Sequence, residues 1–318
     1  MPLTEVPVID LTAPRAAVVA QLAQAAADPG FFQVVNSGLD AAMMADTLAS
    51  AAAFFACDPA VKRAVSRTLE NPFGYYDREL TKNLRDRKEI FDFAPGEETP
   101  WPADMPGLRP ALTGFAAGCH SLALRLTALL CEGLGQAPDS LLQQLVPDHS
   151  SFLRLNHYPV HDLLAGQGVP PGPLGISPHT DAGVLTVLLQ DSVAGLQMQQ
   201  KGSWVDVAPV ADALTINIGD MLQVAANDRY RAPLHRVRAS EGESRLSIAY
   251  FLNPGYHALI EPLPGLLSAA SPACYRTIPW QEFRGLRALG DFGDYGEEVQ
   301  ISHYRRDGAS AAPALESP

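Results

Sequence analysis

The pattern of hydrophobic and polar residues changes near residue 150. Before that point, apolar residues recur at helical spacing, and prolines, aspartates or glycines stand where helices would begin or end. These signals predict helices over residues 14–28, 40–55, 109–134 and 139–146. The run FFQVV predicts a strand over 31–35, and scattered Gly and Pro predict irregular structure over 71–108.

After residue 150, short β-branched and aromatic runs are separated by Gly, Pro, Asn and Asp. They predict strands over 151–158, 184–190, 213–218, 232–238 and 245–252. Because no helical stretch alternates with these strands, a Rossmann-type sheet is disfavoured and an antiparallel β barrel or jelly roll is favoured. We expect a mainly β fold packed against the N-terminal helices, with a loop over 164–175 and a disordered tail after residue 306.

Composition and charge change the list of expected partners. The 318 residues are 47% hydrophobic, which is enough for a sizeable core. The net charge is −12, from 23 Lys and Arg against 35 Asp and Glu. Proteins that bind nucleic acids or anionic membranes need clustered positive charge, so neither partner is expected.

The remaining general signals point to the cytoplasm. The N-terminus carries acidic residues where a signal peptide would carry basic ones, and no run of about 18 apolar residues predicts a membrane span. The four cysteines include no C-x-x-C pair, which argues against a disulfide framework or a cysteine zinc site. We expect a cytoplasmic monomer or weak homodimer.

The residues that indicate chemistry lie on the predicted strands. His179 and Asp181 stand two positions apart at the mouth of one strand, and His235 lies within a later strand. Each is weak evidence alone, since an H-x-D pair is common and a lone histidine is more often structural. Together, two imidazoles and one carboxylate inside one barrel match the facial triad of a non-haem Fe(II) site.

A second pair of residues predicts an anion site. Arg245 and Ser247 follow His235 by ten and twelve residues and share one face of a strand. The planar guanidinium matches a carboxylate, and a nearby hydroxyl can complete the anchor. Because an arginine buried without a carboxylate is costly, this pair predicts a receptor for an acidic ligand. The alternative is that Arg245 pairs with a structural acid.

Longer motifs extend over nearly the whole chain. They are VPVIDL, GFFQVVNSG, FFACDPAVK and RKEIFDF, then LRLNHYP, HTDAGVLTVLLQD, GLQMQ, TINIGDMLQVAANDRYRAPLHRV and SRLSIAYFLNP. In this order they resemble the iron(II)- and 2-oxoglutarate-dependent dioxygenases of the isopenicillin N synthase-like family, which includes flavonoid, gibberellin and cephalosporin-pathway oxygenases. One departure is N-S-G at 36–38, where relatives usually carry N-H-G.

The resemblance implies a fold and a division of the chain. The fold is a distorted double-stranded β-helix, or jelly roll, closed on one side by N-terminal helices. Residues 1–150 would form the helical N-terminal region and 151–256 the jelly-roll core. Residues 257–318 would form a C-terminal segment that closes the pocket, followed by the tail.

The resemblance also implies roles for residues. His179, Asp181 and His235 become the iron ligands, and Arg245 with Ser247 becomes the anchor for the distal carboxylate of 2-oxoglutarate. The metal would be Fe(II), with dioxygen as the oxidant.

Three further residues alternate along one predicted strand. Arg154, Asn156 and Tyr158 therefore face one side, which we expect to be the pocket side. Tyr158 matches a family tyrosine near the cosubstrate, and Asn156 is assigned to the same site by its position. Arg154 is a candidate contact for the prime substrate instead.

The activity implied by the resemblance is the oxidation of an unactivated C–H bond in a small organic substrate, with release of succinate and carbon dioxide. Hydroxylation, desaturation and ring closure all remain open. One rival is a same-fold iron oxidase of the isopenicillin N synthase type, whose R-x-S pair engages the substrate's own carboxylate. The other is a non-enzymatic jelly-roll binding protein. The Ala-rich composition suggests GC-rich coding and a bacterial source. Such a source would favour a role in natural-product tailoring or in hydroxylation of a small acid.

Overall fold

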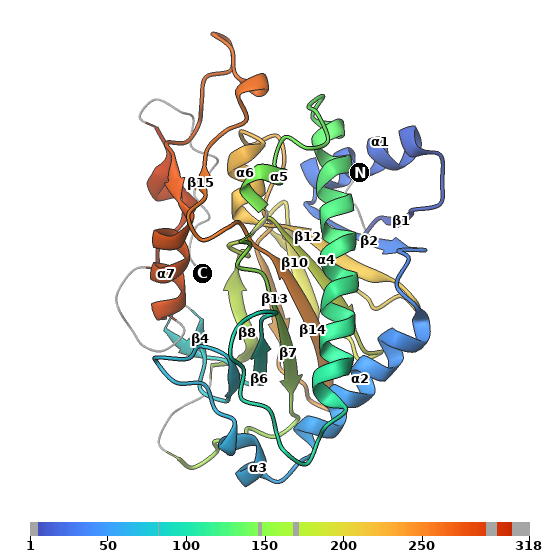
Figure 1. Ribbon diagram of the computed structural model, residues 1–318, viewed down its shortest axis with the longest axis vertical. Coiled ribbons are helices and arrows are strands. Elements are labelled where there is room, and N and C mark those ends of the chain that lie inside the picture. The colour runs from blue at the N-terminus through green and yellow to red at the C-terminus, as the bar shows by residue number, and fades with distance from the viewer. Residues whose placement is uncertain (1–5, 82, 146–147, 168–171, 291–297, 307–318) are drawn as a thin grey trace.

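The computed structural model describes residues 6–81, 83–145, 148–167, 172–290 and 298–306. Strands occupy the centre of the molecule, and helices lie along its outside (Figure 1). The helices are α1 (Arg15–Ala27), α2 (Ala41–Phe55), α3 (Pro59–Ala64), α4 (Leu108–Gly133), α5 (Leu142–Leu145), α6 (Asp220–Ala225) and α7 (Trp280–Gly290), with short 3-10 turns η1 (Pro264–Leu266) and η2 (Ile301–Tyr304).

Two main sheets form the β core. The larger sheet has eight strands in the order β1 (Val8–Asp10), β2 (Phe31–Val35), β12 (Leu214–Ile218), β9 (Leu185–Gln190), β14 (Arg245–Leu252), β7 (Phe152–Tyr158), β6 (Glu89–Phe93) and β3 (Gly74–Tyr76). The smaller has the order β11 (Ser203–Asp206), β10 (Leu196–Gln200), β13 (His235–Arg238) and β8 (Leu174–His179). Two minor pairs are β4 (Leu80–Thr81) with β5 (Leu84–Arg85), and β15 (Leu259–Ile260) with β16 (Ile278–Pro279).

The two main sheets pack face to face, as in a jelly roll. A buried apolar cluster joins Leu188 and Ala249 of the larger sheet to Leu196, Met198 and Val237 of the smaller one. Among the described strands, neighbours are antiparallel except for β1 and β2. The predicted mainly β fold with packed N-terminal helices is confirmed.

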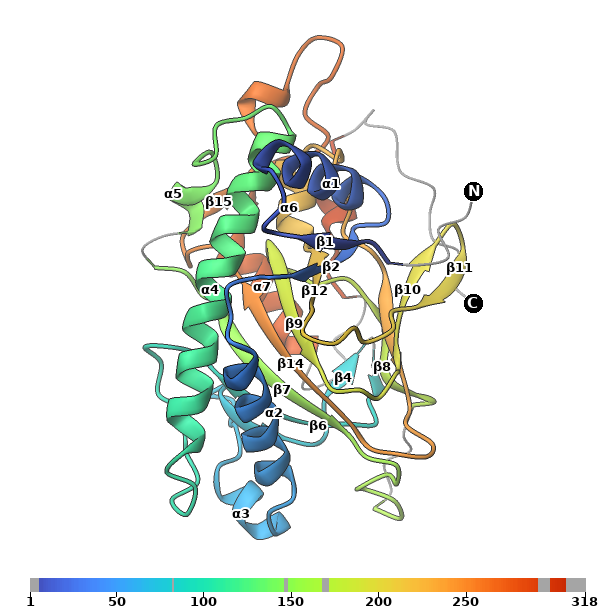
Figure 2. The ribbon, with the colours of Figure 1, turned by 90° about the vertical axis from the view of Figure 1, so that its right-hand side faces the viewer.

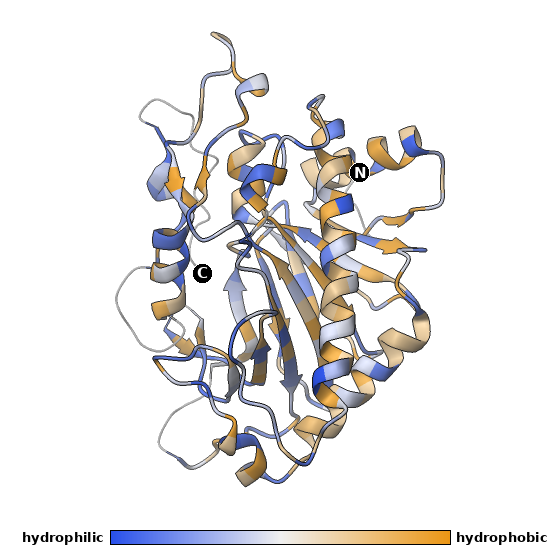
Figure 3. Cartoon of the chain, viewed as in Figure 1, coloured by the Kyte–Doolittle hydropathy of each residue, from blue (hydrophilic) through white to orange (hydrophobic). Residues whose placement is uncertain are grey.

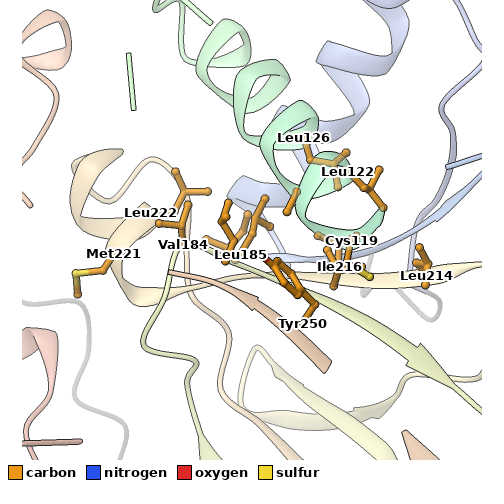
Figure 4. Packing of buried hydrophobic residues seen from close by; sticks show 14 of the residues in the cluster. Cys119, Leu122, Leu126, Val184, Leu185, Leu214, Ile216, Met221, Leu222 and Tyr250 are labelled. Atoms are coloured by element: carbon orange, nitrogen blue, oxygen red, sulfur yellow. The ribbon is translucent and has the colours of Figure 1, made fainter. Parts of the chain in front are cut away.

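The other face of the larger sheet is covered by α4. Cys119, Leu122 and Leu126 of this helix pack near Leu185 of β9 and Ile216 of β12 (Figure 4). Figure 2 shows α4 running along the sheet, and α1 and α2 contact the same helix. By length and composition alone α4 is apolar enough to cross a membrane, but the apolar side chains on its inner face, such as Leu122, Leu126 and Leu130, are buried in this core.

The predicted N-terminal helices over 14–28, 40–55 and 109–134 are confirmed, and Asp40 caps α2 by accepting a hydrogen bond from the Ala42 amide at 2.7 Å. The helix predicted over 139–146 is only α5, and residue 146 lies outside the described residues. Part of the loop over 164–175 and the tail after residue 306 also lie outside them.

The prediction of irregular structure over 71–108 is confirmed for residues 94–107 and wrong for the described residues before them. This segment contains four strands, and β6 lies inside the larger sheet between β3 and β7. Its sequence, EIFDF, carries two acids that suggest exposure, yet every residue of the strand is buried. Lys62 pairs with Glu89 and Arg154 pairs with Asp92. Because these cations come from distant segments, the local sequence does not indicate that the two acids can be buried.

Candidate active site

Three predicted metal ligands meet at one end of the β core. His179 is the last residue of β8 and His235 the first of β13, and the two are directly paired across these antiparallel strands. Asp181 lies in the turn after β8. One Nε2 or carboxylate oxygen from each residue lies within 4.8 Å of the others. Cross-strand pairing and a turn thus assemble the group. The sequence predicted that His179 and Asp181 share one strand face, but Asp181 lies beyond the end of β8.

Hydrogen bonds to Nδ1 hold both imidazoles with Nε2 directed at Asp181. Nδ1 of His179 lies 2.8 Å from the Ser177 carbonyl oxygen, and Nδ1 of His235 lies 3.1 Å from that of Pro233. A carbonyl only accepts, so Nδ1 carries the proton and Nε2 is left with a lone pair. The Nε2 atoms lie 3.7 and 3.6 Å from Oδ1 of Asp181.

The Asp181 carboxylate is held through its other oxygen. Asn217 of β12 donates to Oδ2 at 2.7 Å, and the Thr186 hydroxyl of β9 donates to the same atom. Oδ1 therefore remains directed at the histidines. Neither donor was predicted from the sequence, although the asparagine within the apolar run of β12 is a signal that could have indicated one.

The electrostatics favour metal binding over protonation. Burial and the neighbouring His235 imidazole lower the pKa of His179. Burial alone would raise the pKa of Asp181, but His235, His179 and the two hydrogen bonds lower it. A neutral imidazole and an ionised carboxylate are the forms that bind metals.

The donor set fits Fe(II). Two neutral imidazole nitrogens and one carboxylate oxygen, with their second atoms held by the protein, are the two-His, one-carboxylate arrangement of non-haem iron sites. Such a set leaves coordination positions open for other ligands.

Arg245 and Ser247 lie on β14 and line the same cavity as the three ligands. Arg245 is 1% exposed, and its guanidinium donates to Gln190 Oε1 at 2.7 Å and to Ser247 Oγ at 3.4 Å. Its Nε–H is buried without a hydrogen-bond partner, and no described carboxylate forms an ion pair with it. The described residues therefore do not support the alternative that Arg245 pairs with a structural acid.

This orphaned donor fits a bound carboxylate. A buried cation without a counter-ion is costly, and a dicarboxylate that also reaches the metal would supply one. The residues present thus suit 2-oxoglutarate, with Arg245 and Ser247 as the residues that would hold its distal carboxylate.

The strand β7 presents its alternating side chains to the cavity, as predicted. Phe152, Arg154, Asn156 and Tyr158 all line it. The Tyr158 ring lies 5.0 Å from the Arg245 guanidinium carbon, and Oδ1 of Asn156 is buried without a hydrogen-bond partner. Both residues are thus placed beside the anchor, and their contact with a cosubstrate stays a prediction.

The cavity has a volume of about 440 Å³ and two kinds of wall. Phe152 and Phe251 stack with ring centres 4.7 Å apart on the apolar side. The N-terminal region supplies a charged side with Glu79, Lys88 and Asp92, which was not predicted from the sequence. Figure 3 shows hydrophilic positions within β6 and β7. Helix α7 also lines the cavity, and its Arg287 donates to the Thr180 carbonyl at 2.6 Å.

The charged wall accounts for Arg154. Its guanidinium binds both oxygens of Asp92 at 2.8 Å and lies 3.0 Å from Glu79 Oε1. Lys88 lies 2.5 Å from Glu79 Oε2. Burial alone would raise the pKa of Glu79, but these cations hold it well below its usual range. Arg154 is therefore engaged by two carboxylates, which weakens its candidacy as a simple receptor for an acidic substrate.

Comparisons with known proteins agree with this site. Residues 149–254 match the model of the 2OG-Fe(II) oxygenase superfamily, and residues 6–111 match that of the non-haem dioxygenase in morphine synthesis N-terminal region. Gibberellin 2-beta-dioxygenase 4 of Arabidopsis thaliana is 34% identical over 295 residues, covering 88% of this chain and 89% of that protein. Flavanone 3-dioxygenase 2 of Oryza sativa subsp. japonica is 32% identical, with coverages of 87% and 82%.

Solved structures have the same fold. JOX2 in complex with 2OG, Fe and JA has a TM-score of 0.81 at 29% identity, covering 91% of this chain and 87% of that one. A full-length Neurospora crassa protein in complex with alpha-KG also has a TM-score of 0.81, at 25% identity, with coverages of 92% and 98%. This chain belongs to the 2-oxoglutarate- and Fe(II)-dependent dioxygenases, of the isopenicillin N synthase-like fold. It is an oxidoreductase whose cofactor is iron and whose cosubstrates are 2-oxoglutarate and dioxygen.

Proposed function

We propose that this protein uses dioxygen to oxidise a C–H bond of a small organic molecule in the cavity beside His179, Asp181 and His235. The observation that carries the proposal is the buried Arg245, which forms no ion pair with a described carboxylate and lies in the same cavity as the three ligand atoms. Iron and 2-oxoglutarate, when bound, supply the oxidising chemistry, with decarboxylation of the cosubstrate to succinate.

The chain's own residues supply position and environment. The carbonyls of Ser177 and Pro233 keep both imidazoles facing the metal position, and Asn217 fixes the carboxylate. Arg245 holds one end of the cosubstrate, while the stacked Phe152 and Phe251 present an apolar surface that limits water. These residues therefore decide which C–H bond lies near the metal.

The test is an anaerobic titration of the apoprotein with Fe(II) and then 2-oxoglutarate, followed by the visible charge-transfer band of the chelate. We expect a saturable band. His235→Ala should lose Fe(II) binding, because two ligands hold the ion poorly. His257→Ala is the matched control, since that side chain is exposed and should leave the titration unchanged.

Arg245→Ala should bind Fe(II) normally and weaken 2-oxoglutarate by about 2–4 kcal/mol, the cost of an unpaired buried carboxylate. The same titration measures it. Bound iron without any band in the wild-type protein would favour the oxidase alternative, in which Arg245 and Ser247 engage the substrate's own carboxylate. Retained Fe(II) binding in His235→Ala would contradict the metal assignment.

We further propose a role in natural-product tailoring or in hydroxylation of a small acid. The relatives carry names for oxidations of flavanones and gibberellins, and the cavity joins an aromatic side to a charged side. Screening such compounds for succinate release, with products identified by mass spectrometry, tests this role. Turnover confined to other classes of compound would count against it.

We also propose a cytoplasmic monomer or weak homodimer, without nucleic-acid or membrane partners. The net charge of −12 disfavours polyanionic partners, and the four cysteines Cys57, Cys119, Cys131 and Cys274 are unpaired, as in a reducing compartment. Sedimentation over a range of protein concentrations would measure the assembly.

A further inference from the structure

The guanidinium of Arg245 is positioned by a neutral side chain. Gln190, on the neighbouring strand β9, accepts the hydrogen bond from Nη2 at 2.7 Å through its amide oxygen. An arginine this deeply buried usually pairs with a carboxylate. Here the nearby acid, Asp191, instead accepts hydrogen bonds from the backbone amides of Val193 and Leu246.

Gln190 is itself held by a polar row across the larger sheet. Its Nε2 donates to Thr215 Oγ1 of β12 at 3.1 Å, and Nε2 of Gln33 on β2 donates to the same hydroxyl at 3.3 Å. Gln33 also donates to the Ala208 carbonyl at 2.8 Å. Because the Gln190 amide nitrogen faces the Thr215 hydroxyl, its oxygen is left facing Arg245.

The rest of the Arg245 side chain is confined by packing. A Cβ at Gly195 would approach Arg245 Cδ to 3.1 Å, so this glycine gives the stem its space. The Tyr158 ring lies 5.0 Å from the guanidinium carbon. Gln190 thus fixes one nitrogen of the fork, while the Nε–H has no hydrogen-bond partner.

We propose that Gln190 is a positioning residue that orients Arg245 without neutralising it, and so reserves the positive charge for the distal carboxylate of a 2-oxo dicarboxylic acid. This inference rests on the proposed function, in which Arg245 binds that carboxylate. A glutamate at position 190 would accept the same hydrogen bond but compensate the charge. A neutral amide therefore gives orientation and leaves the cation unpaired until the cosubstrate arrives.

The test compares two ligands that differ only at the distal end. 2-Oxoglutarate and 2-oxopentanoate have the same five-carbon chain and the same chelating end, but only the first has a distal carboxylate. Each is titrated anaerobically into Fe(II)-loaded wild type, Gln190→Glu and Gln190→Met, and the chelate band reports the dissociation constant. Gln199→Glu is the matched control, since it adds the same charge on β10 at a side chain with no hydrogen bond to Arg245.

We expect Gln190→Glu to weaken the binding of 2-oxoglutarate at least tenfold. Gln190→Met should weaken this binding severalfold, because the guanidinium loses its orientation. Both effects are of the order of magnitude of one charge-assisted hydrogen bond. Binding of 2-oxopentanoate and of Fe(II) should change less than about twofold, since neither meets the fork. The ratio of the two dissociation constants is therefore the diagnostic quantity, which a general loss of structure would not change.

Equal weakening of both acids, or wild-type affinity for 2-oxoglutarate in Gln190→Glu, would overturn the inference. If wild-type protein bound Fe(II) but gave no band with 2-oxoglutarate, the proposed function itself would fail. A wild-type band with unresponsive Gln190 variants would leave that function intact and reject only the positioning role.

Discussion

The Asp181 carboxylate shows how single residues determine the site. Only one of its oxygens faces the imidazoles, because Asn217 and Thr186 both donate to the other. A carboxylate held in this way loses little freedom when it binds a metal, and residues that hold metal ligands commonly contribute about 10–100-fold to affinity.

Thr186→Val should therefore weaken Fe(II) binding by about 10–100-fold, because the isosteric side chain cannot donate to Asp181. Thr186→Ser keeps the hydroxyl and should bind nearly as well as wild type. Anaerobic Fe(II) titrations of both variants measure the difference. If valine and serine gave the same affinity, the hydrogen bond would have no role in holding the ligand.

At the scale of elements, the charged wall ties the N-terminal region to the jelly roll. Glu79 precedes β4, and it joins Arg154 of β7 to Lys88 beside β6. Each of these three side chains is at most 15% exposed. Removing one member of a buried ion pair leaves an uncompensated buried charge, which strongly destabilises the folded protein.

Glu79→Gln should lower the free energy of unfolding by about 3–5 kcal/mol, since it strips the counter-charge from buried cations. The exposed pair of Arg15 and Glu132 offers the control, and Glu132→Gln should cost less than about 1 kcal/mol. Urea unfolding of the two variants measures both. Similar costs would mean that the wall is solvated and contributes little to stability.

For the whole molecule, the contact between α4 and the β core predicts a dependence on pH. His120 of α4 stacks on His149 with ring centres 4.3 Å apart, and its Nδ1 lies 2.8 Å from the Tyr250 hydroxyl of β14. Burial lowers the pKa of both histidines, and in His120 the neighbouring His149 adds to the effect. The folded protein thus prefers both rings neutral.

As pH falls through about 6.5, the unfolded chain takes up these protons before the folded one, so the free energy of unfolding should decrease. His120→Gln with His149→Gln removes both groups and should show a smaller decrease. Urea unfolding at about pH 7.5 and about pH 5.5, on either side of the ordinary histidine pKa, gives the comparison for each protein. An equal decrease in wild type and the double variant would show that other groups dominate this range.

Local sequence patterns were enough for the elements whose signals are local. Asp40 and the apolar spacing after it specify α2, and β-branched runs specify β9, β12 and β14. Strands β8, β10 and β11 were not predicted, because their mixed polar runs become strands only by pairing with neighbours.

The sequence by itself determined the kind of chemistry: H-x-D, the distal His235 and R-x-S name the donor types that iron and a dicarboxylate need. The tertiary structure decided how they meet. Pairing of β8 with β13 sets His179 opposite His235, and strands β9 and β12 bring Gln190, Thr186 and Asn217 to the site. Such contacts join residues far apart in the chain, and long-range pairing leaves no periodic trace in the sequence from which to predict them.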